Sequence, residues 1–397
     1  MSLADDRAAA GALLTPEAVR ARCGELHALA LDGRLTGWRL DLGRLPAAAD
    51  FVAEEVRQNY PSLAVPLHAR WRHFAVGGTD RWAALPARDP RMAFDLAITS
   101  VLLDAGAGMA WRYREAATGQ EFARSEGLAV ASFAMFAAGA FAEDGMGRRA
   151  DAGRLASLTA EDLAAGFQAG PENPLVGLEG RASLLRRLGN AVAAAPAVFG
   201  GRPGGLFDHL AGQAEAGALP ARAILIAILH HLGAIWPGRE SLGGVNLGDC
   251  WRHPGIAAPD GLVPFHKLSQ WLSYSLIEPL EDAGIRVTGI DALTGLPEYR
   301  NGGLFLDLGV IRLTNAEDAT RDHAPGSPLI VGWRALTVTL LDAIAPLVRD
   351  RLGVTAAAFP LARVLEGGTW WAGRRLAAER RADGGPPLRI ASDGTLF

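Results

Sequence analysis

The sequence predicts a mainly α-helical fold with few short strands. Apolar residues recur at helical spacing through most of the 397 residues, proline opens several of these stretches, and strand-like alternation is scarce. The first clear helix covers residues 14–31, where Thr15, Pro16 and Glu17 form a start signal and Gly33 follows the end.

Proline lies at or just before the start of four further predicted helices, and each carries an apolar stripe. These helices cover residues 46–60, 90–102, 221–232 and 264–282. Helical spacing without such a start covers residues 124–141, 181–188, 329–352 and 359–380, with a short helical turn over 290–294. Polar or glycine-bearing links are expected over 66–82, 243–254, 297–303 and 315–328, followed by an extended C-terminal tail.

The chain is long enough for one large or two ordinary domains. We expect an N-terminal helical segment with a loop rich in Trp, His and Arg, residues 1–85, packed on a main helical body of residues 86–397. Residues 143–172 are acidic and glycine-bearing around a short helix, which favours a surface excursion.

Composition narrows the class of protein. Hydrophobic residues make up 49% of the chain, which is typical of a soluble globular protein. The formal net charge of -4 gives no overall positive potential that would attract nucleic acid. Two cysteines, Cys23 and Cys250, fit a reducing compartment. The N-terminus is acidic where a signal peptide is basic, and the uncharged run over 127–142 is too short for a membrane span. We therefore expect a cytoplasmic protein with no membrane partner.

The stretch over 263–310 carries the most specific polar residues. Lys267 is the only lysine among 39 basic residues, and a compact ammonium with a tunable pKa cannot be replaced by a guanidinium. On the predicted helix, Lys267 shares one face with Gln270, Trp271 and Tyr274. That face lines a polar cleft or forms a solvated edge, and its aromatic residues favour the cleft.

Further candidates come from other segments. Asp95 lies inside an apolar helix, where a carboxylate needs a partner, either a neighbouring arginine or a cavity. Asn246 and Asp249 lie on the glycine-rich loop, which has neither of the common nucleotide-binding patterns. His68 and Arg70 belong to the loop over 66–82, whose composition suits the border of a pocket or the edge of a core.

Histidines permit a metal hypothesis, but a weak one. His230 and His231 are adjacent, whereas two metal ligands on a helix are usually four residues apart. His253 and His266 are their distant potential partners, and a helix C-terminus that favours imidazole is the alternative. We expect no metal and no cofactor.

Four stretches together resemble the uracil-catabolism protein family of fungi and bacteria. They are GRLTGWRLDLGRLP, LHARWRHFAVGGTDRW, VNLGDCWRHP and VPFHKLSQWLSYSLIEPLEDAGI. The resemblance spans nearly the whole chain. The family has long been a domain of unknown function, and its members accompany a GTP-cyclohydrolase-II-like protein and a uracil phosphoribosyltransferase. Contacts with such pathway enzymes are therefore among the possible partners.

A more distant resemblance supplies chemistry. HKLSQW and LTGLPEYRNGGLFLDLGVI are similar to the queuosine salvage family, which splits the N-glycosidic bond of queuosine 5′-phosphate. Lys267 and Gln270 match its basic-residue-Ala-Gln helix, and residues 298–300 match its Asp-Tyr-Arg motif with a carboxylate one methylene longer. The segment from Phe94 to Trp111 and the ending with GGTWWAGRR match loosely. This resemblance implies a helical fold like that of DNA glycosylases.

The two resemblances imply an N-glycoside hydrolase of pyrimidine catabolism that cleaves a ribosylurea or its 5′-phosphate to urea and ribose or ribose phosphate. Glu298 would stabilise the oxocarbenium-like transition state and deprotonate water. Lys267 is a second catalytic candidate, which would hold the phosphate or leaving group or form an imine. Asp249 is a third, as a competing base, and Asp95 could serve as the base in the same way. Residues expected to contact substrate are Tyr299, Arg300, Gln270, Trp271, Tyr274, Asp95, Trp111, His68, Arg70, His266 and Asn246.

Two other classes stay open. The chain could be a non-catalytic protein that binds a nucleotide intermediate or scaffolds the pathway enzymes. It could also be a metal-dependent hydrolase that uses the four histidines named above. Whether a ribosyl substrate carries a 5′-phosphate stays open as well.

Overall fold

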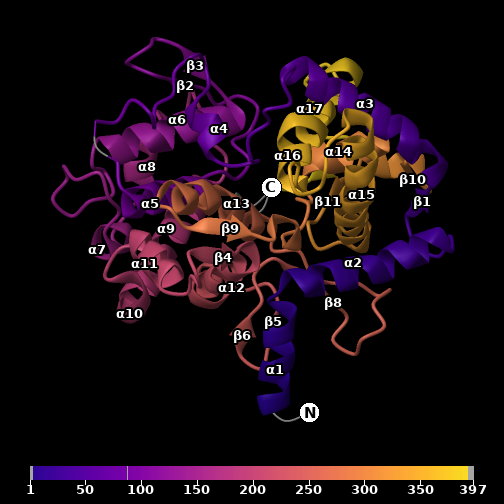
Figure 1. Cartoon of the computed structure of the whole chain (residues 1–397), viewed down its shortest axis with the longest axis horizontal. Coiled ribbons are helices and arrows are strands. Elements are labelled where there is room, and N and C mark those ends of the chain that lie inside the picture. The colour runs from indigo at the N-terminus through magenta and orange to yellow at the C-terminus, as the bar shows by residue number, and fades with distance from the viewer. Residues whose placement is uncertain (1–2, 87, 392–397) are drawn as a thin grey trace. The chain divides into compact units, whose positions relative to one another are not determined.

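A computed structural model describes residues 3–86 and 88–391 of the chain (Figure 1). It is mainly helical with only short strands, which confirms the predicted fold class. The described residues form two compact units, one of residues 3–68, 239–270 and 290–391 and the other of residues 69–86, 88–238 and 271–289. Each unit combines segments far apart in sequence, and the predicted division after residue 85 stays a prediction.

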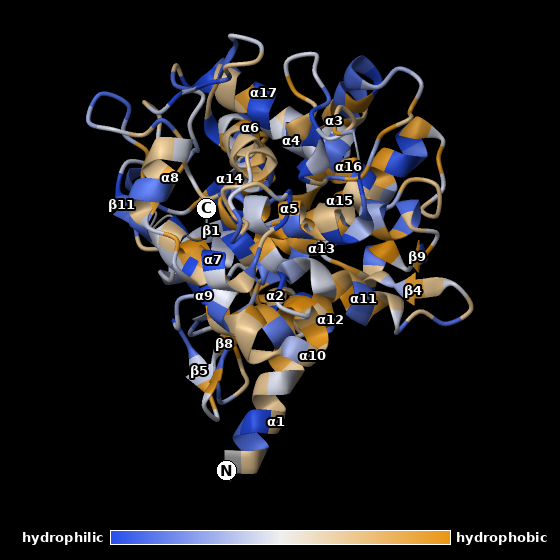
Figure 2. Cartoon of the chain, turned by 90° about the vertical axis from the view of Figure 1, so that its left-hand side faces the viewer, coloured by the Kyte–Doolittle hydropathy of each residue, from blue (hydrophilic) through white to orange (hydrophobic). Residues whose placement is uncertain are grey.

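The first unit is built on α15 (Pro328–Leu352), which packs against α2 (Pro16–Leu31), α3 (Leu45–Asn59) and α14 (Tyr299–Asp307). The Ser327 hydroxyl accepts a hydrogen bond from the first turn of α15, and Gly353 ends the helix at φ 69°. Most of its apolar residues are buried, and its ribbon is largely orange in Figure 2. By length and composition α15 could cross a membrane, but 72% of its most apolar stretch is buried, as in a core helix.

Shorter elements complete the first unit. Its other helices are α1 (Leu3–Leu13), η1 (Leu42–Arg44), η4 (Ile290–Ala292), η5 (Ala316–Ala319), α16 (Leu361–Val364), η6 (Leu365–Thr369) and α17 (Trp370–Arg380). Its strands form four separate pairs: β1 (Trp38–Leu40) with β10 (Ile311–Leu313), β5 (Ser241–Leu242) with β6 (Val245–Asn246), β7 (Cys250–Arg252) with β8 (Leu262–Pro264), and β11 (Asp322–His323) with β12 (Arg389–Ile390). Helix packing, rather than a sheet, therefore forms the core.

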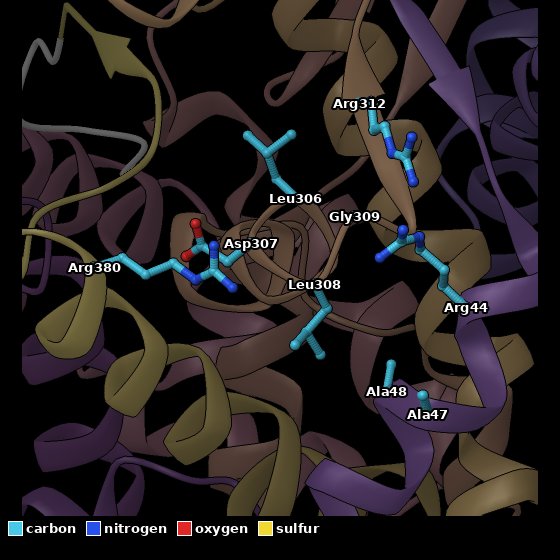
Figure 3. A pocket seen from close by; sticks show the side chains of 9 residues that line it. All are labelled: Arg44, Ala47, Ala48, Leu306, Asp307, Leu308, Gly309, Arg312 and Arg380. Carbon is cyan, nitrogen blue, oxygen red and sulfur yellow. The ribbon is translucent and has the colours of Figure 1, made fainter.

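α14 links the two regions of the first unit that matter below. It packs mainly on α15 and α17. Its first turn follows Glu298, and its last turn borders a pocket of about 670 Å³ (Figure 3).

The second unit centres on α5 (Pro90–Leu102), which packs on α6 (Arg124–Ala137), η2 (Pro203–Gly205) and α11 (Leu206–Ala211). The side chain of Asp89 accepts from Met92 N and opens α5. The other elements are α4 (Trp71–Phe74), α7 (Ala152–Ala156), α8 (Ala160–Gly166), α9 (Leu178–Ala194), α10 (Pro196–Phe199), α12 (Ala221–Leu232), η3 (Gly233–Ile235) and the strand pairs β2 (Tyr113–Arg114) with β3 (Glu121–Phe122) and β4 (Ala218–Pro220) with β9 (Arg286–Thr288).

α13 (Lys267–Asp282) confirms the helix predicted over 264–282, and the division between the units falls after its fourth residue. The four residues of its predicted polar face are all at most 9% exposed: Lys267, Gln270, Trp271 and Tyr274. The alternative of a solvated edge is therefore wrong.

Several boundaries differ from prediction. Residues 297–303, predicted as a link, contain the N-cap and first turns of α14. The predicted helix over 359–380 is interrupted by the π-helical segment η6, which contains Gly367 and Gly368. The predicted loop over 243–254 contains the turn of the β5–β6 hairpin and the whole of β7. In each case glycine marked a special backbone position rather than the absence of regular structure.

The segment 143–172 also differs from the surface excursion that was predicted. It forms two short helices, α7 and α8, and α7 packs closely on α9. Leu155, Leu163 and Phe167 are fully buried. Apolar side chains spaced through an acidic segment thus anchor it in the core of the second unit.

Candidate functional site

Glu298 is the N-cap of α14. Its Oε1 accepts a hydrogen bond of 2.6 Å from Asn301 N, and its Oε2 accepts one of 2.7 Å from Arg300 N. Both amides belong to the first turn, where a helix has no acceptors of its own. The carboxylate is thereby oriented by the backbone of the helix that follows it.

Two glycine contacts fix the position of α14. A Cβ on Gly302 would lie 2.8 Å from the Trp333 ring of α15, whose Nε1 donates a 3.1 Å hydrogen bond to Gly302 O. A Cβ on Gly373 of α17 would clash with the carbonyl oxygen of Arg300. Only glycine permits this close approach, so α14 is clamped between two helices at the end that bears Glu298.

Asp249 holds the start of α13. Its Oδ2 accepts a 3.0 Å hydrogen bond from Lys267 N, while both of its oxygens accept from Arg334 at 2.8 and 2.7 Å. Trp251 Nε1 donates a further bond of 2.8 Å. Burial would raise the pKa of Asp249, but the Arg334 charge and these hydrogen bonds hold it well below its usual range. This carboxylate is fully engaged in holding the fold.

His266 supports the same junction. It adopts φ 50°, a left-handed backbone conformation that costs energy in a residue with a Cβ. Its ring Nε2 lies 3.0 Å from Leu13 O, and burial lowers its pKa. The contacts of His266 thus fix the entry into α13.

Two buried amide side chains reach the segment between α13 and α14. Gln270 Oε1 accepts a 3.2 Å hydrogen bond from Thr294 N, and Asn301 Nδ2 donates one of 3.1 Å to Leu296 O. These bonds assign both amide orientations. They leave Gln270 Nε2 as a donor and Asn301 Oδ1 as an acceptor, each buried and without a partner among the described residues.

We call the residues Lys267, Gln270, Thr294, Glu298 and Asn301 the α13–α14 cluster. Lys267 and Gln270 are one turn apart on α13. The Lys267 charge acts on the Glu298 carboxyl, which in turn holds Asn301 N. The cluster therefore brings a cation, a carboxylate, an amide donor and an amide acceptor together in one unit.

The electrostatics of Glu298 are unusual for an N-cap. Burial raises its pKa, although the Arg300 and Asn301 amides and the charges of Lys267 and Arg300 all favour the ionised form. The side chain nevertheless keeps some exposure. A partly accessible carboxyl with a raised pKa suits proton transfer.

Tyr299 and Arg300 follow on the same helix. Arg300 is buried, donates a 2.9 Å hydrogen bond to Gly384 O and lies 4.7 Å over the Tyr299 ring. Part of its guanidinium is therefore committed to the fold.

His68, from the loop over 66–82, forms a buried pair with Glu366 of η6. His68 Nδ1 lies 2.7 Å from Glu366 Oε2, and the Tyr60 hydroxyl donates to Glu366 Oε1 at 3.4 Å.

Asn246 makes a local turn contact, in which its Oδ1 accepts a hydrogen bond of 2.9 Å from Gly248 N.

In the second unit, Arg70 and Trp271 lie together. The Arg70 guanidinium bonds to Ser100 at 2.8 Å and to Asp104 at 2.6 Å, and it lies 5.6 Å from the Trp271 ring. Tyr274, one turn further along α13, is fully buried. The described contacts of Arg70 make it a core cation paired with a carboxylate.

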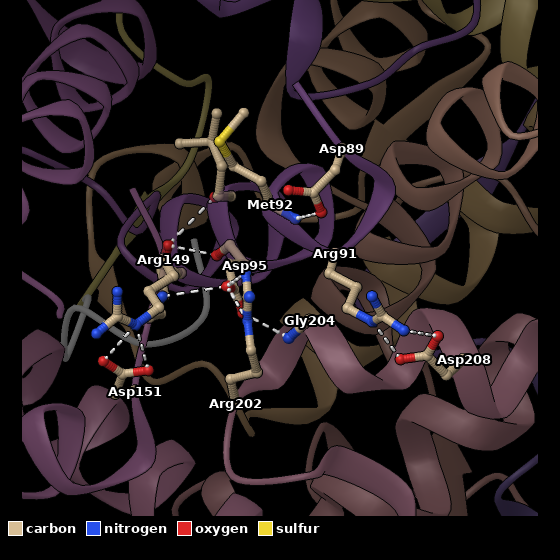
Figure 4. A network of polar contacts seen from close by, with 12 residues as sticks. Asp89, Arg91, Met92, Asp95, Arg149, Asp151, Arg202, Gly204 and Asp208 are labelled. Atoms are coloured by element: carbon tan, nitrogen blue, oxygen red, sulfur yellow. Dashed lines mark hydrogen bonds and ion pairs between the residues drawn. The ribbon is translucent and has the colours of Figure 1, made fainter. Parts of the chain in front are cut away.

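Asp95 belongs to a separate network in the second unit (Figure 4). Arg202 pairs with its carboxylate, and the amides of Ala150 and Gly204 donate to it. Burial raises the pKa of Asp95 to about 6, against the opposing pull of Arg202 and the two amides. These contacts match the arginine partner considered from the sequence. Trp111 is likewise buried, and its Nε1 donates to Phe167 O at 2.9 Å.

The four histidines of the metal hypothesis, His230, His231, His253 and His266, all lie in the described part of the chain and do not form a common group of metal ligands there. The rings of His231 and His209 are 5.0 Å apart, and His253 Nδ1 accepts from Gly255 N at 2.9 Å. Within residues 3–86 and 88–391, no three His, Cys, Asp or Glu side chains are grouped as metal ligands would be.

The sequence reasoning missed Arg334 and Asn301. Arg334 is a single arginine inside the apolar stretch LIVGWRALTVTLL, and a lone charge in such a helix signals a buried partner. Asn301 directly follows the matched residues 298–300, where the motif was taken to end.

Comparisons with known proteins agree with one another. The family model described as "Protein of unknown function (DUF1688)" matches residues 12–397. "Protein urg3" of Schizosaccharomyces pombe is 38% identical, with 97% of this chain and 98% of the relative aligned. "Uracil catabolism protein 4" of Lachancea kluyveri is 36% identical over 92% of this chain and 93% of the relative. These matches confirm the resemblance to the uracil-catabolism family. Because the family model and both relatives cover nearly the whole chain, this chain belongs to the DUF1688 family.

Proposed function

We propose that the protein takes part in uracil catabolism as an N-glycoside hydrolase that splits a ribosylurea, or its 5′-phosphate, into urea and the sugar. The printed name of the Lachancea kluyveri relative supports the pathway. The observation that carries the chemistry is Glu298, a partly buried carboxyl whose pKa is raised by burial although the charge of Lys267 acts on it to favour the ionised form.

In the proposed reaction, water attacks the anomeric carbon as the bond from that carbon to the urea nitrogen breaks. Glu298 stabilises the positive charge that develops on the sugar and accepts a proton from the water. The proton that Glu298 accepts passes on to the departing nitrogen, so that neutral urea leaves and Glu298 is ionised again. Lys267 binds the 5′-phosphate or the leaving group as a point charge.

The unpartnered amide atoms of the cluster suit the leaving group. A ureido group has a carbonyl oxygen that accepts and N–H groups that donate. Gln270 Nε2 would donate to the oxygen, and Asn301 Oδ1 would accept from an N–H. Leaving such buried atoms unpaired costs about 1–3 kcal/mol each, which binding of this ligand would recover.

The test is to incubate the purified protein with ribosylurea, with and without the 5′-phosphate, and to measure urea and reducing sugar. Wild type should release both in equal amounts. Glu298→Gln should reduce the rate by about a hundredfold or more, because it removes the charge that acts in the transition state. Glu317→Gln is the matched control, since Glu317 is 72% exposed and lies on η5. Urea release by Glu298→Gln within a few-fold of wild type would exclude the assignment.

A non-catalytic binding or scaffold protein is the second candidate. One observation favours it: both Glu298 oxygens already accept backbone hydrogen bonds, as in a purely structural cap. Calorimetry that detects ribosylurea binding with no turnover, alone or with the neighbouring pathway enzymes, would support this candidate over hydrolysis.

A further inference from the structure

A pocket of about 670 Å³ lies at the end of α14 opposite to Glu298 (Figure 3). The helix has nine residues, so its two ends are about 13 Å apart. The walls come from the start of α3, the end of α14, β10 and the end of α17, all in the first unit. The pocket is therefore distinct from the α13–α14 cluster, and its size is that of a small-molecule site.

Two arginines converge on one point of this pocket. A Cβ built on Gly309 would lie 3.4 Å from Arg44 Nη1 and 3.6 Å from Arg312 Nε. A single carboxylate oxygen, Asp41 Oδ2, lies 3.2 Å from Arg44 Nε and 3.3 Å from Arg312 Nη2. One carboxylate thus serves two guanidinium groups and leaves an excess of positive charge.

A third arginine adds to this excess. Arg380 lines the pocket, is exposed and has no hydrogen bond or ion pair to the part of the chain that the structure describes. The pocket's own acid, Asp307, is already neutralised by a two-bond pair with Arg381 at 2.8 and 2.6 Å. Arg44 and Arg312 therefore share one carboxylate while Arg380 has none, and the excess positive charge of the three guanidinium groups favours a bound anion.

The pairing of β1 with β10 places a further arginine opposite Arg312. Arg39 of β1 lies directly opposite Arg312 of β10 in the antiparallel pair. Like charges in opposite positions destabilise a strand pair. An anion close to Arg312 would relieve the repulsion.

The rest of the lining limits the kind of anion. The first turn of α3, with Ala47 and Ala48, presents the positive end of that helix. Leu306 and Leu308 add apolar surface. The volume is much larger than one phosphate group needs. We propose that this pocket binds a phosphate monoester with an apolar face, best matched by a nucleoside 5′-monophosphate, whose charge at neutral pH equals the excess on the arginines.

The test is calorimetry on the full-length protein with adenosine 5′-monophosphate, adenosine and inorganic phosphate. The monophosphate should bind, adenosine should not, and inorganic phosphate should bind more weakly. Arg312→Gln and Arg380→Gln should each weaken monophosphate binding about tenfold or more, since each removes a charge-assisted contact. Both arginines lie at the surface, and circular dichroism would verify that the variants fold.

Two control variants locate the binding. Arg34→Gln removes a charge from a side chain that is 71% exposed and does not line the pocket, so affinity should not change. Glu298→Gln should also retain binding, which separates this proposal from the proposed hydrolase. The assignment is overturned if wild type does not bind at millimolar monophosphate, if inorganic phosphate binds as tightly, or if Arg312→Gln and Arg380→Gln bind like wild type.

Discussion

At the residue scale, Glu298 combines two demands on one carboxyl. As an N-cap it satisfies two amides of α14, which favours the ionised form. Burial favours the protonated form and prevails, so its pKa is raised. A side chain needed only as a cap would be better served by exposed aspartate or serine. A partly buried glutamate on which the charge of a lysine acts is the feature that favours a chemical role.

Lys267 gives a prediction that separates binding from proton transfer. Lys267→Arg keeps the positive charge near Glu298, so the pH profile of kcat should stay unchanged. Lys267 is only 9% exposed, so the larger planar guanidinium does not fit the space that the lysine side chain occupies. Substrate binding should therefore weaken, and KM should rise about tenfold or more, equivalent to about 1.4 kcal/mol.

Steady-state kinetics on ribosylurea across the pH range would check this prediction. Lys267→Met is the companion variant, because it keeps the length and loses the charge. A shifted pH optimum with unchanged KM in Lys267→Arg would instead give Lys267 a part in proton transfer.

The sequence located this site only in part. Lys267 stood out by composition, Gln270 by its helical spacing from Lys267, and the role of Glu298 came from a resemblance in a short motif. Arg334 and Asp249 are 85 residues apart in the chain, and no local pattern shows that they meet. The free amide atoms of Gln270 and Asn301 depend on backbone groups of the intervening segment, which only the folded structure places.

At the element scale, apolar periodicity predicted the long helices well and the glycine positions poorly. The helices now seen as α2, α3, α5, α12 and α15 were expected within a few residues of their bounds. Gly302 and Gly303 led to the prediction of a link, because glycine weakens an isolated helix. Within α14, Gly302 instead permits contact with Trp333, an interaction that depends on a residue 31 positions further along.

This reasoning predicts opposite effects for two glycine substitutions inside helices. Gly302→Ala should destabilise the protein by about 1–3 kcal/mol, since the new Cβ would lie 2.8 Å from the Trp333 ring and 2.9 Å from Thr337 Oγ1. It should also lower activity, because α14 carries Glu298. Gly24→Ala in α2 has no atom within 4 Å of its Cβ and should stabilise by about 0.5–1 kcal/mol.

Urea denaturation of both variants would measure the difference. Equal changes in the free energy of unfolding would contradict the clamped position of α14. A loss of stability in Gly302→Ala without any loss of activity would argue against the placement of the active site at this helix.

At the scale of the whole molecule, the pH dependence of stability is set by buried carboxyls whose pKa values are shifted in opposite directions. The pKa of Asp249 is held below its usual range, so its contribution is complete above about pH 4 and is lost as the pH falls further. Burial raises the pKa of Asp95 to about 6, so the folded state binds that proton more tightly than the unfolded chain. Its contribution therefore falls as the pH rises from about 4 to about 6. Glu298, with a raised pKa, acts in the same direction as Asp95.

The free energy of unfolding should consequently pass through a maximum in mild acid, and Asp249→Asn should test its acid side. The substitution leaves the buried Arg334 without its charged partner and should cost about 3–5 kcal/mol at neutral pH. It also removes the group whose protonation destabilises the wild type in acid. The variant should therefore lose less stability than wild type between about pH 4 and pH 2. Denaturant titrations of both proteins at several pH values would measure this, with the exposed pair removed by Glu317→Gln as control. Parallel acid limbs for Asp249→Asn and wild type would show that the Asp249–Arg334 pair does not control acid stability.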